Sequence, residues 1–89
     1  LGKIPFNPST NINFDLPASH DMNGSVQLTV YDISGRKIKA LCDDLMSPGS
    51  YQFNWDGTNL YGEAVSSGVY FYTLKTSDFI KSMKMTLLK

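Results

Sequence analysis

The chain has 89 residues, of which 42% are hydrophobic, so it is long enough for one small folded domain. A domain of this size buries roughly 60–65% of the surface that its unfolded chain exposes, which leaves a thin core and little room for a deep catalytic cleft. Eight basic residues balance eight acidic residues, so no net field favours nucleic acid or an anionic membrane surface.

The chain begins with Leu1 and not with methionine, so we expect it to be a processed or excised part of a longer protein. No apolar run approaches the ~20 residues that a helix needs to cross a bilayer, and we expect no direct insertion into a membrane. Pro5 and Pro8 cannot both lie in a central strand, which predicts an extended lead-in over residues 1–8. Residues 9–89 then form the folded domain.

Within residues 9–89, apolar and polar residues alternate with a period of two, which predicts β-strands. Glycine, proline, asparagine and aspartate residues separate these segments and indicate turns. The run from residue 69 to residue 74 is the most β-prone, and apolar residues on both of its faces predict a central strand. The apolar residues on one face of the other main strands are Ile12, Phe14 and Leu16; Val26, Leu28 and Val30; Tyr51, Phe53 and Trp55; and Met83, Met85 and Leu87.

About seven short strands at spacings of roughly 8–12 residues are typical of an all-β, immunoglobulin-like antiparallel sandwich. No window has a convincing helical period, and the stretch from residue 39 to residue 46, which comes nearest to one, is short. The strand near Ile38 is expected to fade near Asp43, which places Asp43 and Asp44 in a solvated turn. Trp55 is expected to fill the core, where a sandwich of this kind needs one large aromatic residue.

No arrangement of residues predicts catalysis. Cys42 and His20 are the only cysteine and histidine, and they lack the sequence context of a Cys–His nucleophile. Residues 56–63 invite a calcium interpretation, but the fifth position, where an EF-hand loop needs an oxygen ligand, is a leucine. We expect Asp56 and Asn59 to cap turns instead. With no phosphate-binding loop and no basic–aromatic pattern, we expect no enzyme activity, cofactor, metal or nucleic-acid partner.

Several motifs occur together in a recognisable order. They are Pro5–Thr10, then Ile12, Phe14 and Leu16-Pro17, then Val30–Arg36, Gly49, Trp55–Gly57, Ser67–Tyr72 and Lys84–Lys89. In this order, and over nearly its whole length, the chain resembles the type A C-terminal sorting domains of the type IX secretion system. The immunoglobulin-like module of flagellar hook-capping proteins is a related family, and the basic, apolar ending favours the sorting family. The core and signature residues are Phe14, Val30, Trp55, Gly68, Tyr70 and Tyr72.

The resemblance implies a non-catalytic tag at the C-terminus of a larger cargo protein. The cargo would reach the periplasm of a two-membrane bacterium and then cross the outer membrane through the type IX system. The implied partners are an outer-membrane receptor of that system and a sortase-like peptidase, which would cut near or before Leu1. The implied location is therefore the outer cell surface or the medium.

The last strand is the segment that we expect a receptor to recognise. A terminal strand at a sheet edge has unpaired backbone groups that can pair with another protein, and the same edge offers a route to self-association. Its lysines either supply polar contacts or only keep the edge soluble, and both roles stay open. The expected recognition residues are Phe79, Lys81, Lys84, Met85, Leu87, Leu88 and Lys89.

Three alternative functions also stay open. The chain could be a carbohydrate-binding accessory module, in which Tyr61 or Tyr51 stacks on a sugar. It could be a structural subunit of an extracellular filament, in which residues 1–8 or the last strand complete a neighbouring sandwich. It could also be an assembly module of the hook-capping type.

Overall fold

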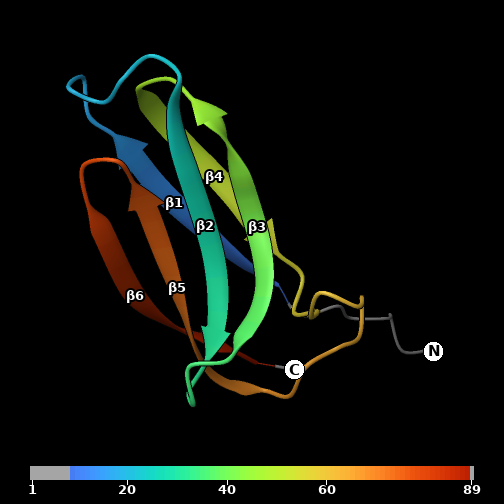
Figure 1. Ribbon diagram of the computed structural model, residues 1–89. Helices are drawn as coiled ribbons and strands as arrows, with labels where there is room; N and C mark the ends of the chain where they lie inside the picture. The colour runs from blue at the N-terminus through green and yellow to red at the C-terminus, as the bar shows by residue number, and fades with distance from the viewer. Residues whose placement is uncertain (1–8, 89) are drawn as a thin grey trace, which may run out of the picture.

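The computed structural model describes residues 9–88 and shows an all-β, immunoglobulin-like sandwich of two antiparallel sheets (Figure 1). This confirms the predicted fold class. The lead-in expected over residues 1–8, and Lys89, lie outside the described residues. The strands of residues 9–88 are β1 (Thr10–Leu16), β2 (Gly24–Asp32), β3 (Lys37–Met46), β4 (Gly49–Trp55), β5 (Gly68–Thr76) and β6 (Ile80–Leu87).

These six strands compare with an expectation of about seven. The stretch between β4 and β5 adds no further strand, because it forms only an isolated bridge between Thr58 and Ala64. Residues 9–88 contain no helix that is long and apolar enough to span a membrane.

The two sheets differ in width. β1 pairs with β4 alone, whereas the larger sheet has the order β3–β2–β5–β6. Figure 1 shows β1 and β4 behind the larger sheet, with β6 at its outer edge. The central strands β2 and β5 are therefore well covered, but of the residues in β6 only Leu87 is fully buried. The smaller sheet thus leaves most of the inner face of β6 without a covering strand.

The core consists of two clusters of buried side chains that come from the predicted alternation. Trp55 has no exposed surface, and its ring meets the Tyr70 ring edge-on with centroids 5.0 Å apart. Such a contact adds to the stabilisation from burial alone. The first cluster contains Ile12, Phe14, Leu16, Val26, Leu28 and Leu74, and the second contains Val30, Trp55, Tyr70 and Leu87.

β3 continues beyond the point at which the sequence predicts that it fades. Asp43 and Asp44 lie within β3, opposite Gln27 and Val26, and both are exposed. Aspartate is unfavourable in strands, but pairing with the backbone of β2 outweighs this preference. The predicted turn at Asp43 and Asp44 is therefore wrong, and the strand ends at Met46.

His20 is part of the β1–β2 loop and its side chain is buried, although the sequence predicts only a turn there. Its Nε2 atom is 2.9 Å from the carbonyl oxygen of Met46. A methyl group added at Gly24 would lie 2.7 Å from Cε1 and 2.8 Å from Nε2 of this ring. Movement of the ring away from this methyl group would disturb its hydrogen bond to Met46. Gly24 is therefore the residue that leaves room for His20.

We expect Gly24→Ala to destabilise the domain by about 1–3 kcal/mol, because the added methyl group overlaps the His20 ring. Without this overlap, a glycine-to-alanine change would stabilise by ~0.4–1 kcal/mol through the unfolded state. Urea unfolding measures the difference. The same change in a His20→Ala background should cost little or should stabilise, and an equal cost in both backgrounds would contradict the explanation.

Candidate functional site

β6 lies at the edge of the larger sheet, as expected for the last strand. It pairs with β5 alone, so the backbone groups on its other side have no strand partner within residues 9–88. Such an edge is a template for pairing with another chain unless side chains discourage it. The edge of β6 is therefore accessible to a partner, and its role in recognition stays a prediction.

The two described lysines of β6 lie on opposite faces of the sheet. Lys81 lies opposite Leu74, a core residue, and so belongs to the inner face. Lys84 lies opposite Phe71 and belongs to the outer face. Neither lysine side chain has a hydrogen bond or an ion pair within residues 9–88. A charge on the inner face hinders edge-to-edge pairing of identical chains, whereas Lys84 is free to meet a partner on the outside.

The other expected recognition residues divide between the core and the surface. Leu87 is 1% exposed, and Met85 is half-buried against both core clusters, so these two side chains hold β6 in place. Phe79 precedes β6 and packs against the first cluster. Leu88 follows β6 and is 73% exposed. Of these residues, a receptor could reach Leu88 directly but could reach Leu87 only through its backbone.

The signature residues form the middle of the sandwich. The Tyr70 hydroxyl donates a hydrogen bond of 2.7 Å to the carbonyl oxygen of Ser66, which resembles the tyrosine corner of immunoglobulin domains. Burial raises the pKa of Tyr70, so the phenol stays protonated and keeps donating. Gly68, at the start of β5, has a φ of 151°, which favours glycine. Phe14, Val30, Trp55 and Tyr70 are buried, and Tyr72 is half-buried.

A groove of about 600 Å³ lies between the edge of the smaller sheet and the hairpin of β5 and β6. It is present because two strands do not cover the inner face of four. Asn13 and Asp15 line it from β1, and Lys81 lines it from β6. Its apolar lining residues are Phe14, Pro17, Tyr72, Leu74, Phe79, Ile80 and Met83.

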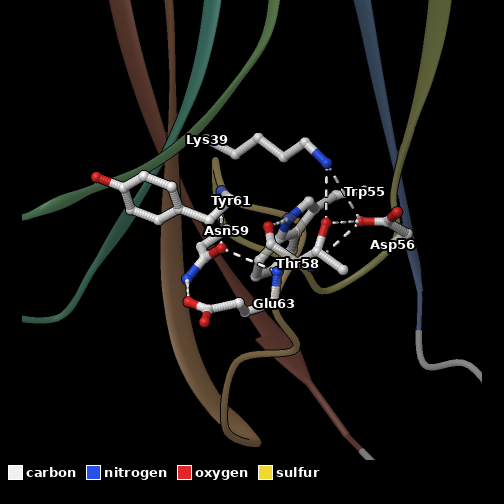
Figure 2. A network of polar contacts seen from close by, with 7 residues as sticks. All are labelled: Lys39, Trp55, Asp56, Thr58, Asn59, Tyr61 and Glu63. Carbon is white, nitrogen blue, oxygen red and sulfur yellow. Dashed lines mark hydrogen bonds and ion pairs between the residues drawn. The ribbon is translucent and has the colours of Figure 1, made fainter.

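A network of polar contacts joins the β4–β5 loop to β3, the other edge of the larger sheet (Figure 2). Lys39 of β3 donates a hydrogen bond of 2.8 Å from Nζ to Thr58 Oγ1, and this Nζ lies 3.7 Å from Asp56 Oδ1. The Thr58 hydroxyl donates to the same Asp56 oxygen over 2.6 Å. The Trp55 ring donates from Nε1 to the Thr58 carbonyl oxygen over 2.9 Å. The network therefore ties the edge strand to the core tryptophan.

Side chains also cap the rest of this loop, as expected for Asp56 and Asn59. Asn59 Oδ1 accepts hydrogen bonds from the backbone N–H groups of Tyr61 and Glu63, over 2.9 and 3.0 Å. Asp56 Oδ1 accepts from the Thr58 N–H over 3.1 Å. Within residues 9–88, no group of three or more histidine, cysteine or acidic residues is placed to hold a metal ion.

The tyrosines do not form a common platform for a sugar. Tyr61 is 78% exposed and extends away from the network in Figure 2. Tyr51 stacks on Phe14 with ring centroids 5.6 Å apart and donates its hydroxyl to the Ser47 carbonyl oxygen. Trp55 lies in the core, as expected. An exposed stacking surface is thus limited to Tyr61 among the residues considered for this role.

Cys42 and His20 both contact Met46, but they are not arranged as a nucleophile and a base. Burial raises the pKa of the Cys42 thiol, and the nearby Asp44 and Asp43 carboxylates raise it further. The thiol therefore stays protonated at neutral pH, whereas the thiolate is the nucleophile. The Cys42 sulfur lies 3.6 Å from the Met46 sulfur, and His20 Nε2 is engaged with the Met46 carbonyl oxygen.

We expect Thr58→Val to lower the free energy of unfolding by about 0.5–1.5 kcal/mol, because it removes the hydroxyl that links Lys39 to Asp56. The branched shape and the carbonyl oxygen that binds Trp55 are kept. Urea unfolding measures the loss. Thr86→Val is the matched control, because the Thr86 side chain is exposed and has no hydrogen bond within residues 9–88. Its effect should stay within ~0.5 kcal/mol of zero.

We expect Asp56→Asn to weaken the pH dependence of stability in the acid range. The side-chain hydrogen bond from Thr58, with the nearby Lys39 charge, holds the pKa of Asp56 below its ordinary value. Because the folded value is depressed, Asp56 stabilises the fold above the unfolded pKa of about 3.9 and loses this effect as pH falls through the folded value.

The melting temperature, measured from about pH 2 to pH 7, should therefore fall less steeply with acid in Asp56→Asn than in the wild type. Asp21→Asn is the matched control, because the Asp21 side chain has no hydrogen bond or ion pair within residues 9–88. Identical profiles for Asp56→Asn and the wild type would show that the network does not act through this carboxylate.

Comparison with known proteins supports a specific family. The sequence profile of the FlgD Ig-like domain matches residues 3–78, which is most of the chain, and β6 lies beyond this range. The structure of FlgD from P. aeruginosa has a TM-score of 0.64 and 26% identity over 89% of this chain. FlgD from Xanthomonas campestris, described in relation to hook capping and flagellar assembly, shares the fold with a TM-score of 0.54 and 19% identity over 91% of this chain.

The likeness covers part of each of these proteins, namely 59% of the P. aeruginosa chain and 67% of the Xanthomonas campestris chain. No curated protein matches this chain. The match over residues 3–78, together with the shared fold, identifies the chain as a member of the FlgD Ig-like domain family, a family of non-catalytic structural modules.

Proposed function

We propose that the chain is a non-catalytic C-terminal sorting domain, which directs a larger cargo protein through the type IX secretion system to the medium or to the cell surface. The observation that supports this proposal is β6, an exposed edge strand whose two described lysines have no partner within residues 9–88. The sequence of β6 resembles the ending of sorting domains. It also lies beyond residues 3–78, so the FlgD Ig-like match does not account for it.

In this proposal an outer-membrane receptor adds a strand to the free edge of β6. Backbone hydrogen bonds supply affinity, and side chains supply specificity. Lys84, on the outer face, meets an acidic group of the receptor. Leu87 and Met85 anchor β6 to both parts of the core, so the receptor meets a preformed edge. The domain must therefore be folded before recognition. A sortase-like peptidase then removes the domain by cutting the chain ahead of it.

A second candidate is an assembly module of the hook-capping type, because the chain belongs to the FlgD Ig-like family. The two functions differ in what the domain depends on. A sorting domain works on an unrelated cargo and needs the type IX system. An assembly module works within its own protein and needs the structure that it helps to build.

A fusion of the chain to a periplasm-targeted fluorescent cargo, expressed in a bacterium with the type IX system, tests the sorting function. Deletion of residues 79–89 is a poor test, because it removes buried Leu87 and would unfold the domain. We expect Lys84→Glu to reduce the surface-displayed fraction about tenfold, because it places like charges together across the interface. Cell fractionation and surface labelling measure the displayed fraction.

Lys75→Glu is the matched control, because Lys75 is exposed on the neighbouring strand β5 and its side chain has no hydrogen bond or ion pair within residues 9–88. This fusion should be displayed normally, and thermal unfolding should be similar for both variants. Normal display of Lys84→Glu would remove Lys84 from the recognition site. Retention of the wild-type fusion in the periplasm would overturn the sorting function and would favour the assembly module.

A further inference from the structure

We propose that the groove between β1 and the hairpin of β5 and β6 is a docking site for an extended segment of another protein. In this proposal the segment pairs with the free edge of β1 and becomes the third strand of the smaller sheet. It carries apolar side chains at alternate positions and a carboxylate near Lys81. The proposal concerns a different face of the domain from the one that the sorting receptor uses, and it does not depend on the sorting function.

The space for such a strand follows from the difference in width between the sheets. β1 has a strand partner on one side only, and its residues Asn13 and Asp15 line the groove. Neighbouring strands lie about 4.8 Å apart, so a strand added to β1 would extend the smaller sheet toward β6. It would then cover the inner face of the hairpin, where Met83 is 44% exposed although it lies opposite half-buried Tyr72.

The chemistry of the groove matches one face of a β-strand. Its lining includes three aromatic side chains and two aliphatic ones, all at positions that turn toward the interior or flank it. Side chains on a strand alternate between faces, so a partner with apolar residues at every second position would place them against this surface. The backbone of the partner would pair with β1 on the same side. A compact ligand would contact the apolar surface but would leave the edge of β1 unpaired. An extended segment would contact the apolar surface and would also pair with β1.

Lys81 indicates which charge we expect on the partner segment. It lines the groove and has no hydrogen bond or ion pair within residues 9–88. The nearby Asp15 carboxylate already accepts a hydrogen bond of 2.6 Å from the Ser50 hydroxyl. At the other edge of the same sheet, the corresponding inward lysine, Lys39, does have partners, namely Thr58 and Asp56. Asp15 keeps its negative charge, but no carboxylate within residues 9–88 lies within ion-pair distance of Lys81, which favours a segment with a carboxylate.

Residues 9–88 of a second copy do not fit this role. Among residues 9–88, the longest segment outside the strands is 56–67, and its own hydrogen bonds and the Thr58–Ala64 bridge hold it in place. The other connections have seven residues or fewer, as seen for residues 17–23 between β1 and β2. The described part of a second copy thus offers no free segment for the groove, and a segment of another protein is the occupant that we infer.

Three synthetic ten-residue peptides provide the test. Each alternates valine and threonine, and in each one valine is replaced, by aspartate, asparagine or lysine. Titration into the isotope-labelled 89-residue chain, followed by NMR, should shift the amide signals of Asn13 and Asp15 and the methyl signal of Met83. We expect the aspartate peptide to bind about threefold more tightly than the lysine peptide, the difference typical of one exposed ion pair.

Two substitutions sharpen this test. Lys81→Glu should reverse the order of the aspartate and lysine peptides. Met83→Arg should weaken all three peptides at least about fivefold, because it fills the groove with a charged side chain. Thr86→Arg is the matched control, since Thr86 lies on the outer face of the same strand, and it should leave binding unchanged. Thermal unfolding establishes that each variant is folded.

Four results would overturn the proposal. They are no binding of any peptide at millimolar concentration, shifts confined to the outer edge of β6, an unchanged order of peptides in Lys81→Glu, and a dimer in which a second copy protects the groove. Sedimentation velocity and hydrogen exchange detect the dimer. None of these results bears on cargo display through Lys84, so the two proposals fail separately.

Discussion

A two-stranded sheet has to cover the apolar inner face of a four-stranded sheet, and this constraint shapes the whole domain. Where the cover is complete, the side chains of Val26, Leu28 and Val30 have no exposed surface. Where the cover stops, Met83 remains partly exposed on the same inner face. The core is thin, and its uncovered part opens to solvent as a groove. The groove and the exposure of Met83 therefore have a common origin.

The two edges of the larger sheet differ in whether another segment of the domain covers them. Each edge strand has a lysine on its inner face, which is one of the ways in which proteins discourage edge-to-edge pairing. At β3 the β4–β5 loop folds back over the edge, and Lys39 bonds to Thr58 and Asp56. At β6 no described segment folds back, and Lys81 remains without a partner. Of the two edges of the larger sheet, the one at β6 is thus the edge that the described residues leave open.

Much of the sandwich was predictable from local pattern, and the exceptions depend on contacts between distant residues. The alternation in β1, β2, β4 and β5 survives in the structure because one face of each strand is buried. β3 runs past Asp43 because β2 pairs with it, and local composition does not reveal that pairing. The burial of His20 depends on the end of β3, twenty-six residues away. Alternation alone puts Lys81 on the face of Met83, but the point where the smaller sheet stops is visible only in the fold.

Family membership and function rest on different parts of this chain. The FlgD Ig-like match covers β1 to β5, whose buried residues any sandwich of this topology needs. That match therefore supports the architecture without choosing between a sorting tag and an assembly module. The choice between these two functions depends on β6, which has Lys84 on its outer face and Lys81 on its inner face. A receptor on the outer edge and a segment in the groove would contact opposite faces of one strand. A strand in the groove would also support β6 from beneath, so its binding would favour the rigid edge that a receptor needs.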